Sequence, residues 1–296
     1  IAGTAATLTG NQSFDNGTLY VDAGANEVGV ATTDPGATLD VNGDLIVIAS
    51  GWTPVLEPGS EDPEFAFRKR RVLDARVCRS ADGGSTWERA DTVTVADASA
   101  DWFIPFGDIV EGPNGLAVPF YSSSPEGKRN TAWMLRSTDD GRTWDDGSII
   151  AANDFNETDI LHLGDSRWLA ACRTMQDGHV QLLASTDDGR TWQDRSPLTL
   201  PGQHPPHLAH LKDGRILLTY GIRNEGLYGV AARFSDDAGN SWSAPRILVA
   251  LEGATDGGYP SSTECEDGTI VTAYYANKVV AHRRYHMGVV RWQADA

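Results

Sequence analysis

The sequence has few cysteines, a shortage of basic residues and no long apolar run, and each shortage excludes a class of protein. The 296 residues contain 3 cysteines, which are too few and too scattered for a disulfide framework or a zinc site. Acidic residues number 41 against 24 basic ones, so the net charge of −17 argues against a nucleic-acid partner, which needs clustered Lys and Arg. No run of about 18 apolar residues occurs, so insertion into a membrane is not expected.

Helical periodicity is missing as well, and this absence points to the fold class. The apolar fraction of 40% is enough to fill a sizeable core, and 31 glycines suit a chain rich in turns. Because no apolar repeat every three to four residues is present, we expect strands to build that core. The sequence therefore predicts an all-β protein.

One motif, Ser-x-Asp-x-Gly-x-Thr/Ser-Trp, occurs four times at starts 57, 48 and 50 residues apart. The four copies are Ser80–Trp87, Ser137–Trp144, Ser185–Trp192 and Ser235–Trp242. In each copy the Asp can accept hydrogen bonds from turn N–H groups, the Gly supplies a positive φ, and the Trp buries a large ring. These acids are interpreted as acceptors within hairpin turns and not as catalysts or metal ligands.

A second pattern, two apolar strands joined by a tight turn, occurs five times. Its copies are residues 37–49, 108–120, 159–171, 207–219 and 262–274. Asn-Gly or Asp-Gly marks the turn in four of them, which is a strong hairpin pattern, and a third strand precedes each copy of the Ser-to-Trp motif. Four short strands per unit of about 50 residues predict a β-propeller.

The expected blade number is six, with five as the alternative. Five units carry the strand pattern, and residues 5–33 are rich enough in β-prone residues to form a sixth blade or strands that close the ring. We therefore divide the chain into an N-terminal β segment, residues 1–36, and a single propeller, residues 37–296.

Aligning the five units on their central turns predicts where a site lies. The start of the innermost strand and the end of the second strand share one face, called the mouth here. The first position holds Asp34, Phe106, Glu157, Pro205 and Tyr259, and the second holds Ser50, Ser122, Arg173, Gly221 and Tyr275. Glu157, Arg173 and Tyr259 are thus expected to converge, with His204, His207 and Arg223 nearby, and a funnel with convergent polar groups is a typical binding site.

The repeats resemble the sialidase superfamily of propellers, in which the Ser-to-Trp motif is called the Asp box. Phe155-Asn-Glu-Thr, followed by Arg173, resembles the segment with the catalytic Glu and a substrate-binding Arg, and Gly258-Tyr-Pro-Ser-Ser resembles the segment with the Tyr nucleophile. The resemblance implies that Tyr259 is the nucleophile, that Glu157 takes its proton, and that Arg173 binds the carboxylate of an acidic sugar.

The sequence departs from that family at three positions. Thr33 stands where the resemblance implies the first of three arginines, and Gly226–Gly229 stands where it implies the third, for which Arg223 can substitute. The acid/base Asp has no unambiguous match, and Asp62 is the best candidate. Arg71, in the one basic cluster, belongs to a loop that is expected to overhang the mouth and to attract an acidic glycan.

A second resemblance concerns residues 17–43, which are similar to a segment of phage tail fibres and other surface fibres. It implies a receptor-recognition head at an extracellular or virion surface, and a homo-oligomer if the chain is part of a fibre. Three functions remain open: a glycosidase acting on an acidic sugar, a non-catalytic glycan-binding head, and a polysaccharide lyase using a Tyr/His pair. The expected partner is a glycan or acidic saccharide, and no cofactor is indicated.

Overall fold

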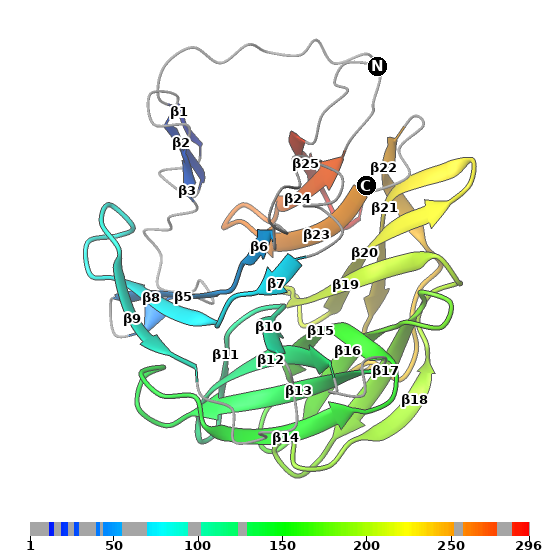
Figure 1. Cartoon of the computed structure of the whole chain (residues 1–296). Coiled ribbons are helices and arrows are strands. Elements are labelled where there is room, and N and C mark those ends of the chain that lie inside the picture. Colours follow the sequence, from blue (N-terminus) through cyan, green and yellow to red (C-terminus); the bar gives the residue numbers. More distant parts are fainter. Residues whose placement is uncertain are drawn as a thin grey trace, which may run out of the picture. The chain divides into compact units, whose positions relative to one another are not determined.

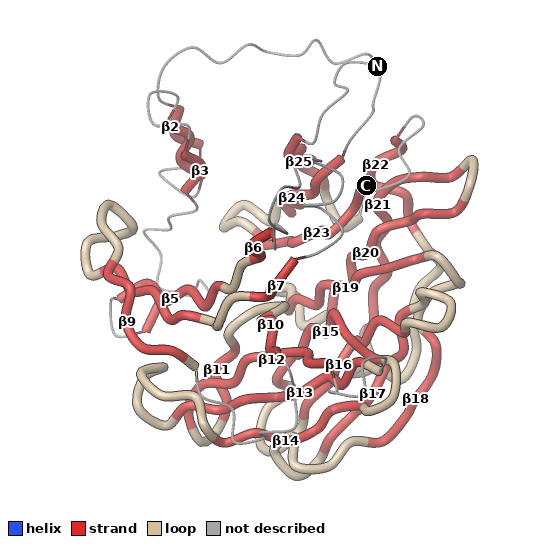
Figure 2. Tube along the Cα trace, viewed as in Figure 1, coloured by secondary structure: helices blue, strands red, loops and turns tan. Residues whose placement is uncertain are grey.

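The structure is a computed structural model, and it describes residues 12–14, 19–22, 27–29, 40–41, 44–54, 70–93, 102–123, 129–251, 257–276 and 286–295. Every regular element among these residues is a strand, so the all-β prediction is confirmed for this part of the chain (Figure 2). No helix in these segments is long and apolar enough to cross a membrane. Residue contacts divide the chain into two compact units, which are described one at a time.

The first unit comprises residues 1–94 and 137–145 and holds three antiparallel sheets. The first sheet has the order β1-β2-β3, the second β4-β5-β8-β9 (blade 1), and the third β6-β7. The strands are β1 Gln12–Phe14, β2 Leu19–Asp22, β3 Glu27–Gly29, β4 Asp40–Val41, β5 Asp44–Ala49, β6 Trp52–Pro54, β7 Arg70–Val72, β8 Arg76–Ser80 and β9 Glu88–Thr92.

The second unit comprises residues 95–136 and 146–296 and holds four antiparallel sheets (Figure 1). Blade 2 has the order β10-β12-β13-β14 with β11 paired to β12, blade 3 runs β15-β16-β17-β18, blade 4 runs β19-β20-β21-β22, and the terminal sheet runs β23-β24-β25. The strands of blade 2 are β10 Trp102–Pro105, β11 Val110–Gly112, β12 Gly115–Ser123, β13 Asn130–Ser137 and β14 Asp146–Ala151. Those of blade 3 are β15 Phe155–His162, β16 Trp168–Thr174, β17 Val180–Ser185 and β18 Gln193–Pro197. The remaining strands are β19 Gln203–His210, β20 Ile216–Asn224, β21 Leu227–Ser235, β22 Arg246–Leu251, β23 Gly257–Glu264, β24 Ile270–Ala276 and β25 His286–Trp292.

The core of the second unit lies between neighbouring sheets. In blade 3 the second strand, β16, is buried along nearly its whole length, whereas the outermost strand, β18, is exposed at every residue. One apolar cluster joins blades 3 and 4 through Leu169, Leu182, Leu208 and Tyr220. The first strands of successive sheets, β15, β19 and β23, contact one another in turn. Side chains at the starts of these strands are therefore brought together.

The Asp boxes form the predicted hairpin turns between the third and fourth strands. In the third box, Asp187 accepts hydrogen bonds from the Thr191 N–H (2.9 Å) and the Thr191 hydroxyl (2.6 Å). The Ser185 hydroxyl accepts the Gly189 N–H (2.9 Å), and Gly189 has φ = 69°. The Trp192 indole N–H donates to the Gly189 carbonyl (3.0 Å). The other three boxes repeat these bonds, so the structural interpretation is confirmed.

The prediction of six blades, with five as the alternative, is wrong for the part of the chain that the structure describes. Four sheets there have four or more strands, and they are the four blades. The β-prone N-terminal segment forms its own three-stranded sheet from strands of three or four residues, because short antiparallel neighbours pair locally. The fifth repeat also forms a sheet of three strands. The boundary predicted at residue 36 stays a prediction.

Candidate functional site

A β-bulge at the mouth end of three consecutive first strands sets the geometry of the site. In β15, Asn156 and Glu157 together lie opposite the single residue Arg173, because the register slips between residues 155 and 158. The same slip occurs in β19, between residues 203 and 206, and in β23, between residues 258 and 261. A bulge bends its strand and re-aims the side chains in it, so each sheet turns a polar residue away from the regular ladder.

Three predicted site residues, each from a different strand, meet at the carboxylate of Glu157. The Tyr259 hydroxyl donates a short hydrogen bond to Glu157 Oε1, and Arg173 Nη1 donates to Glu157 Oε2 at 2.5 Å. Glu157 is 7% exposed, so its carboxylate is removed from water and relies on these two partners. Burial first, and then the adjacent Glu157 charge, raise the pKa of Tyr259, which keeps the phenol protonated at neutral pH.

Aromatic rings and a second guanidinium surround the Tyr259 ring. Tyr275 lies at a centroid distance of 5.2 Å and Phe106 at 5.9 Å. The Arg223 guanidinium carbon lies 5.4 Å from the Tyr259 ring centroid, and Arg223 donates to the Gly257 carbonyl (3.2 Å) and to the Tyr275 hydroxyl (3.3 Å). Two arginines, Arg173 and Arg223, therefore flank one tyrosine, an arrangement suited to an anion.

Two residues after the aligned positions Phe106, Glu157 and Pro205, three charged groups form a layer in which Asp159 and His207 are buried and Asp108 is partly exposed. His207 Nε2 lies 3.2 Å from Asp108 Oδ2, and the fully buried Asp159 accepts the N–H groups of Asp108 (3.2 Å), Ile160 (3.0 Å) and Leu208 (2.6 Å). Burial opposes the charge of His207, but Asp108 and Asp159 outweigh it and raise the pKa of His207 to about 9. Burial raises the pKa of Asp159 to about 6, against the effect of His207. This layer ties blades 2, 3 and 4 together beneath the tyrosine.

The predicted site residues divide into three groups. The structure brings Tyr259, Glu157, Arg173 and Arg223 together, as the alignment of the repeats predicted. His204 and His207 lie in the same unit but are buried, His207 in the charged layer and His204 against Gly178. The last two stay predictions: Asp62 is outside the described residues, and Arg71 lies in β7 of the first unit, with its backbone alone described.

Sequence reasoning missed Asp108 and Asp159 as members of the charged layer. Both stand two residues after an aligned mouth position, and alternate residues of a strand point to the same face. That periodicity could have placed them beneath Phe106 and Glu157. What it could not show is that His207 contacts Asp108.

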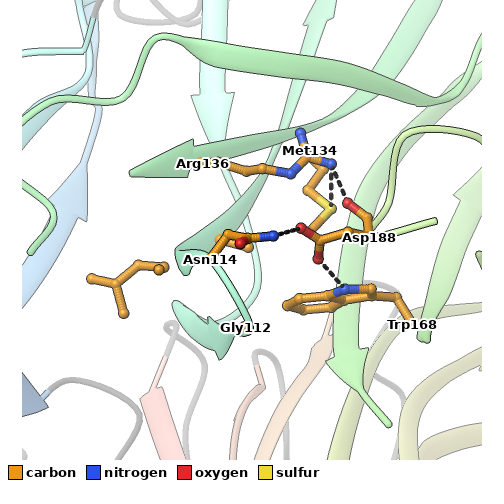
Figure 3. A pocket seen from close by; sticks show the side chains of 9 residues that line it. Gly112, Asn114, Met134, Arg136, Trp168 and Asp188 are labelled. Carbon is orange, nitrogen blue, oxygen red and sulfur yellow. Dashed lines mark hydrogen bonds between the residues drawn. The ribbon is translucent and has the colours of Figure 1, made fainter. Parts of the chain in front are cut away.

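The second unit also contains a small cavity that belongs to its framework (Figure 3). Its space of ≈ 10 Å³ is about that of one water molecule. Arg136 Nη2 donates to the Asp188 carbonyl (2.7 Å), while the Asp188 carboxylate accepts the Trp168 indole N–H (2.9 Å) and the Asn114 amide (2.8 Å). These bonds hold the third Asp box against blade 2. Among the described residues, no group of three His, Cys, Asp or Glu side chains is placed to hold a metal ion.

The sheets and the Asp boxes define the chain as a β-propeller built from BNR-type repeats. The chain belongs to the family described as BNR repeat-like domain, whose sequence profile matches residues 52–272. No curated protein matches the chain.

Solved structures share the fold at low sequence identity. A protein of unknown function from Dyadobacter fermentans is 22% identical, with a TM-score of 0.67 over 84% of this chain and 72% of that one. A Hadza microbial sialidase is 18% identical, with a TM-score of 0.64 over 86% of this chain. The intramolecular trans-sialidase of Ruminococcus gnavus, solved with oseltamivir carboxylate, is 18% identical, with a TM-score of 0.55 over 99% of this chain and 67% of that one. The chain spans 50% of the length of the Hadza sialidase, and these likenesses concern the fold alone.

Proposed function

We propose that the chain is a sialidase-like glycosidase that acts on an acidic sugar of a glycan or polysaccharide. The observation that carries the proposal is the hydrogen bond from the Tyr259 hydroxyl to the Glu157 carboxylate, between residues 102 positions apart in the sequence. A phenol with a raised pKa is a poor nucleophile unless an adjacent base takes its proton. Glu157 is that base, and the neutral phenol approaches an anionic sugar without charge repulsion.

In the first step Tyr259 Oη bonds to the anomeric carbon of the sugar while its proton passes to Glu157. The glycosidic C–O bond breaks, and the leaving oxygen takes a proton from an acid, for which Asp62 stays the sequence-based candidate. Water then gives a proton to the conjugate base of that acid and attacks the anomeric carbon. The bond between this carbon and Tyr259 Oη breaks, the sugar is released, and Glu157 returns its proton to Tyr259 Oη. Arg173 and Arg223 orient the sugar carboxylate from either side of the phenol.

The test compares the unmodified chain with Tyr259→Phe on a panel of sialylated and uronate-containing oligosaccharides. We expect product from the unmodified chain and none from Tyr259→Phe. Tyr274→Phe is the matched control, because it removes the hydroxyl of a half-buried tyrosine on the neighbouring strand β24. Product formation by Tyr259→Phe would contradict the proposal.

A second candidate is a non-catalytic glycan-binding head. One observation favours it: Arg173 Nη1 donates to Glu157, so fewer N–H groups of this guanidinium can bind a substrate carboxylate. The test is the same panel, on which saturable binding without product, equal in Tyr259→Phe, would support this candidate. The fibre-like segment of residues 17–43 and an extracellular or virion-surface location belong with it as predictions.

The lyase alternative gains no support from the contacts of the site. A Tyr/His pair would need an imidazole free to exchange a proton with substrate, whereas His207 is 5% exposed and lies against Asp108. An unsaturated uronate among the products would support the lyase alternative.

A further inference from the structure

The backbone of the proposed nucleophile adopts a conformation that tyrosine rarely takes. Tyr259 has φ = 49° and follows Gly258, which has φ = 99°. A non-glycine residue at positive φ is strained, and such strain persists only where the surrounding structure holds it. The contacts that hold this segment are therefore part of what directs the Tyr259 hydroxyl at Glu157.

Those contacts come from a glycine in another sheet. A Cβ built on Gly258 would lie 2.8 Å from the Gly221 Cα, and a Cβ built on Gly221 would lie 2.6 Å from the His204 carbonyl oxygen and 3.2 Å from the Gly258 Cα. Real Cβ atoms do not approach other atoms so closely, and backbone cannot swing aside as a side chain can. The two glycines therefore let the backbones of β20 and β23 meet.

The repeat shows what Gly221 replaces. Gly221 lies opposite the bulge of β19, in the position that Arg173 holds opposite the bulge of β15. In blade 3 that position projects a guanidinium towards Glu157. In blade 4 it has no side chain, and the space next to it is filled by the Gly258 backbone of the terminal sheet.

We propose that Gly221 is a positioning residue for Tyr259. By lacking a Cβ, Gly221 lets the bulge of β23 sit against β20, which keeps Tyr259 in its left-handed conformation with its hydroxyl on Glu157. The inference rests on the proposed function for its consequence in catalysis, but the placement of the hydroxyl can be measured without a sugar.

The experiment measures the reactivity of the Tyr259 hydroxyl with an aryl sulfonyl fluoride. The phenol oxygen bonds to sulfur, fluoride leaves, and the phenolic proton passes to Glu157, so the labelling rate reports the Tyr259–Glu157 contact. Mass analysis of the peptide containing Tyr259 gives the rate. In Gly221→Ala we expect labelling at least about tenfold slower than in the unmodified chain, since small displacements of reacting groups have effects of this size.

Gly147→Ala is the matched control. A Cβ there would lie 3.0 Å from the Leu135 side chain, so the substitution also crowds a packed strand of the second unit, but in blade 2. Its thermal unfolding is expected to shift in the same direction but less than in Gly221→Ala, because the Leu135 side chain can move aside, and the labelling rate of Tyr259 is expected to stay unchanged. A purely structural role for Gly221 would slow labelling in neither variant.

Equal labelling in Gly221→Ala and the unmodified chain would overturn the inference while leaving the proposed function intact. Absence of labelling in the unmodified chain would instead count against activation by Glu157, and so against the proposed function. A crystal structure of the unmodified chain serves if Gly221→Ala does not fold. The inference is supported if Gly221 contacts Gly258 and Tyr259 has a positive φ with its hydroxyl bonded to Glu157. It is contradicted if Tyr259 makes the same hydrogen bond from an extended backbone.

Discussion

The mouth and the Asp boxes use the same kinds of group, carboxylates bonded to hydroxyls and N–H donors, but over very different sequence distances. Every partner of Asp187 lies within four residues, whereas the partners of Glu157 lie 16 and 102 residues away. The Asp187 carboxylate is exposed and held by its own turn, while Glu157 and Asp159 are buried and each accepts a hydrogen bond from another sheet. Local bonds define a turn, and long-range bonds define a site.

The largest expected contrast between the two regions is in activity. Glu157→Gln should lower kcat about a thousandfold, because an amide cannot take the phenolic proton. Its thermal stability should fall as well, because the amide leaves the Arg173 guanidinium without its carboxylate, although Gln can still accept from Tyr259. Asp187→Asn in the third box is the control and should hydrolyse the substrate like the unmodified chain. A rate above a tenth of normal in Glu157→Gln would contradict the assignment.

The next contrast is in stability at the charged layer. Asp159→Asn should lower the free energy of unfolding by about 4 kcal/mol, because the new amide nitrogen cannot accept the N–H groups that the carboxylate accepts. Asp165→Asn, at an exposed turn of the same hairpin with φ = 52°, should have almost no effect. Urea unfolding at neutral pH measures both. Equal losses would remove the distinction between buried and exposed carboxylates.

Alkaline pH should weaken the mouth and spare the boxes. The pKa of His207 is raised from 6.5 to about 9 in the folded chain, so its contribution is complete below pH 6.5 and is lost as pH rises through 9. The loss amounts to at most about 3 kcal/mol, because above pH 9 Asp108 and Asp159 face a neutral imidazole. Melting temperatures from pH 6 to 10 test this, and His207→Gln should flatten that decline. An unchanged slope would show that another group titrates.

The smallest effect is expected at a single Asp box. Asp187→Ala should cost about 1 kcal/mol at neutral pH, since its hydrogen bonds are exposed to water. Hydrogen bonds from Thr191 hold the pKa of Asp187 at about 2, so the contribution is present above pH 3.8 and is lost as pH falls through 2. The difference from the unmodified chain should therefore shrink between pH 4 and 2. A constant difference in urea unfolding would mean that the ionised carboxylate is not what stabilises the turn.

How much the sequence predicted follows the same division. The boxes were predicted down to the acceptor role of their Asp, because each bond closes within one turn. Burial of the box Trp was not uniform: Trp144 is 2% exposed but Trp87 is 44% exposed, and a local motif does not specify its tertiary neighbours. The convergence of Glu157, Arg173 and Tyr259 followed from aligning the repeats.

Other features of the site could not be derived from the sequence. Alignment of the repeats gives the position of a residue along its strand, but it does not give the position of a bulge. In β23 the bulged pair is Tyr259 and Pro260, whereas in β15 it is Asn156 and Glu157, which lies one residue earlier relative to the turn that follows. The contact of Gly221 with Gly258 likewise depends on how two sheets approach each other. The blade number failed for a related reason, since strand propensity does not say which sheet a strand joins.

The three N–H groups that Asp159 accepts come from Asp108 next to blade 2, Ile160 of blade 3 and Leu208 of blade 4. A carboxylate that binds three sheets at once makes the opening of any one of them break bonds in the others. These amides should consequently exchange their hydrogens with solvent together, as one cooperative unit, at rates set by the opening of the whole group. The amides of the exposed strand β18 should exchange independently and faster.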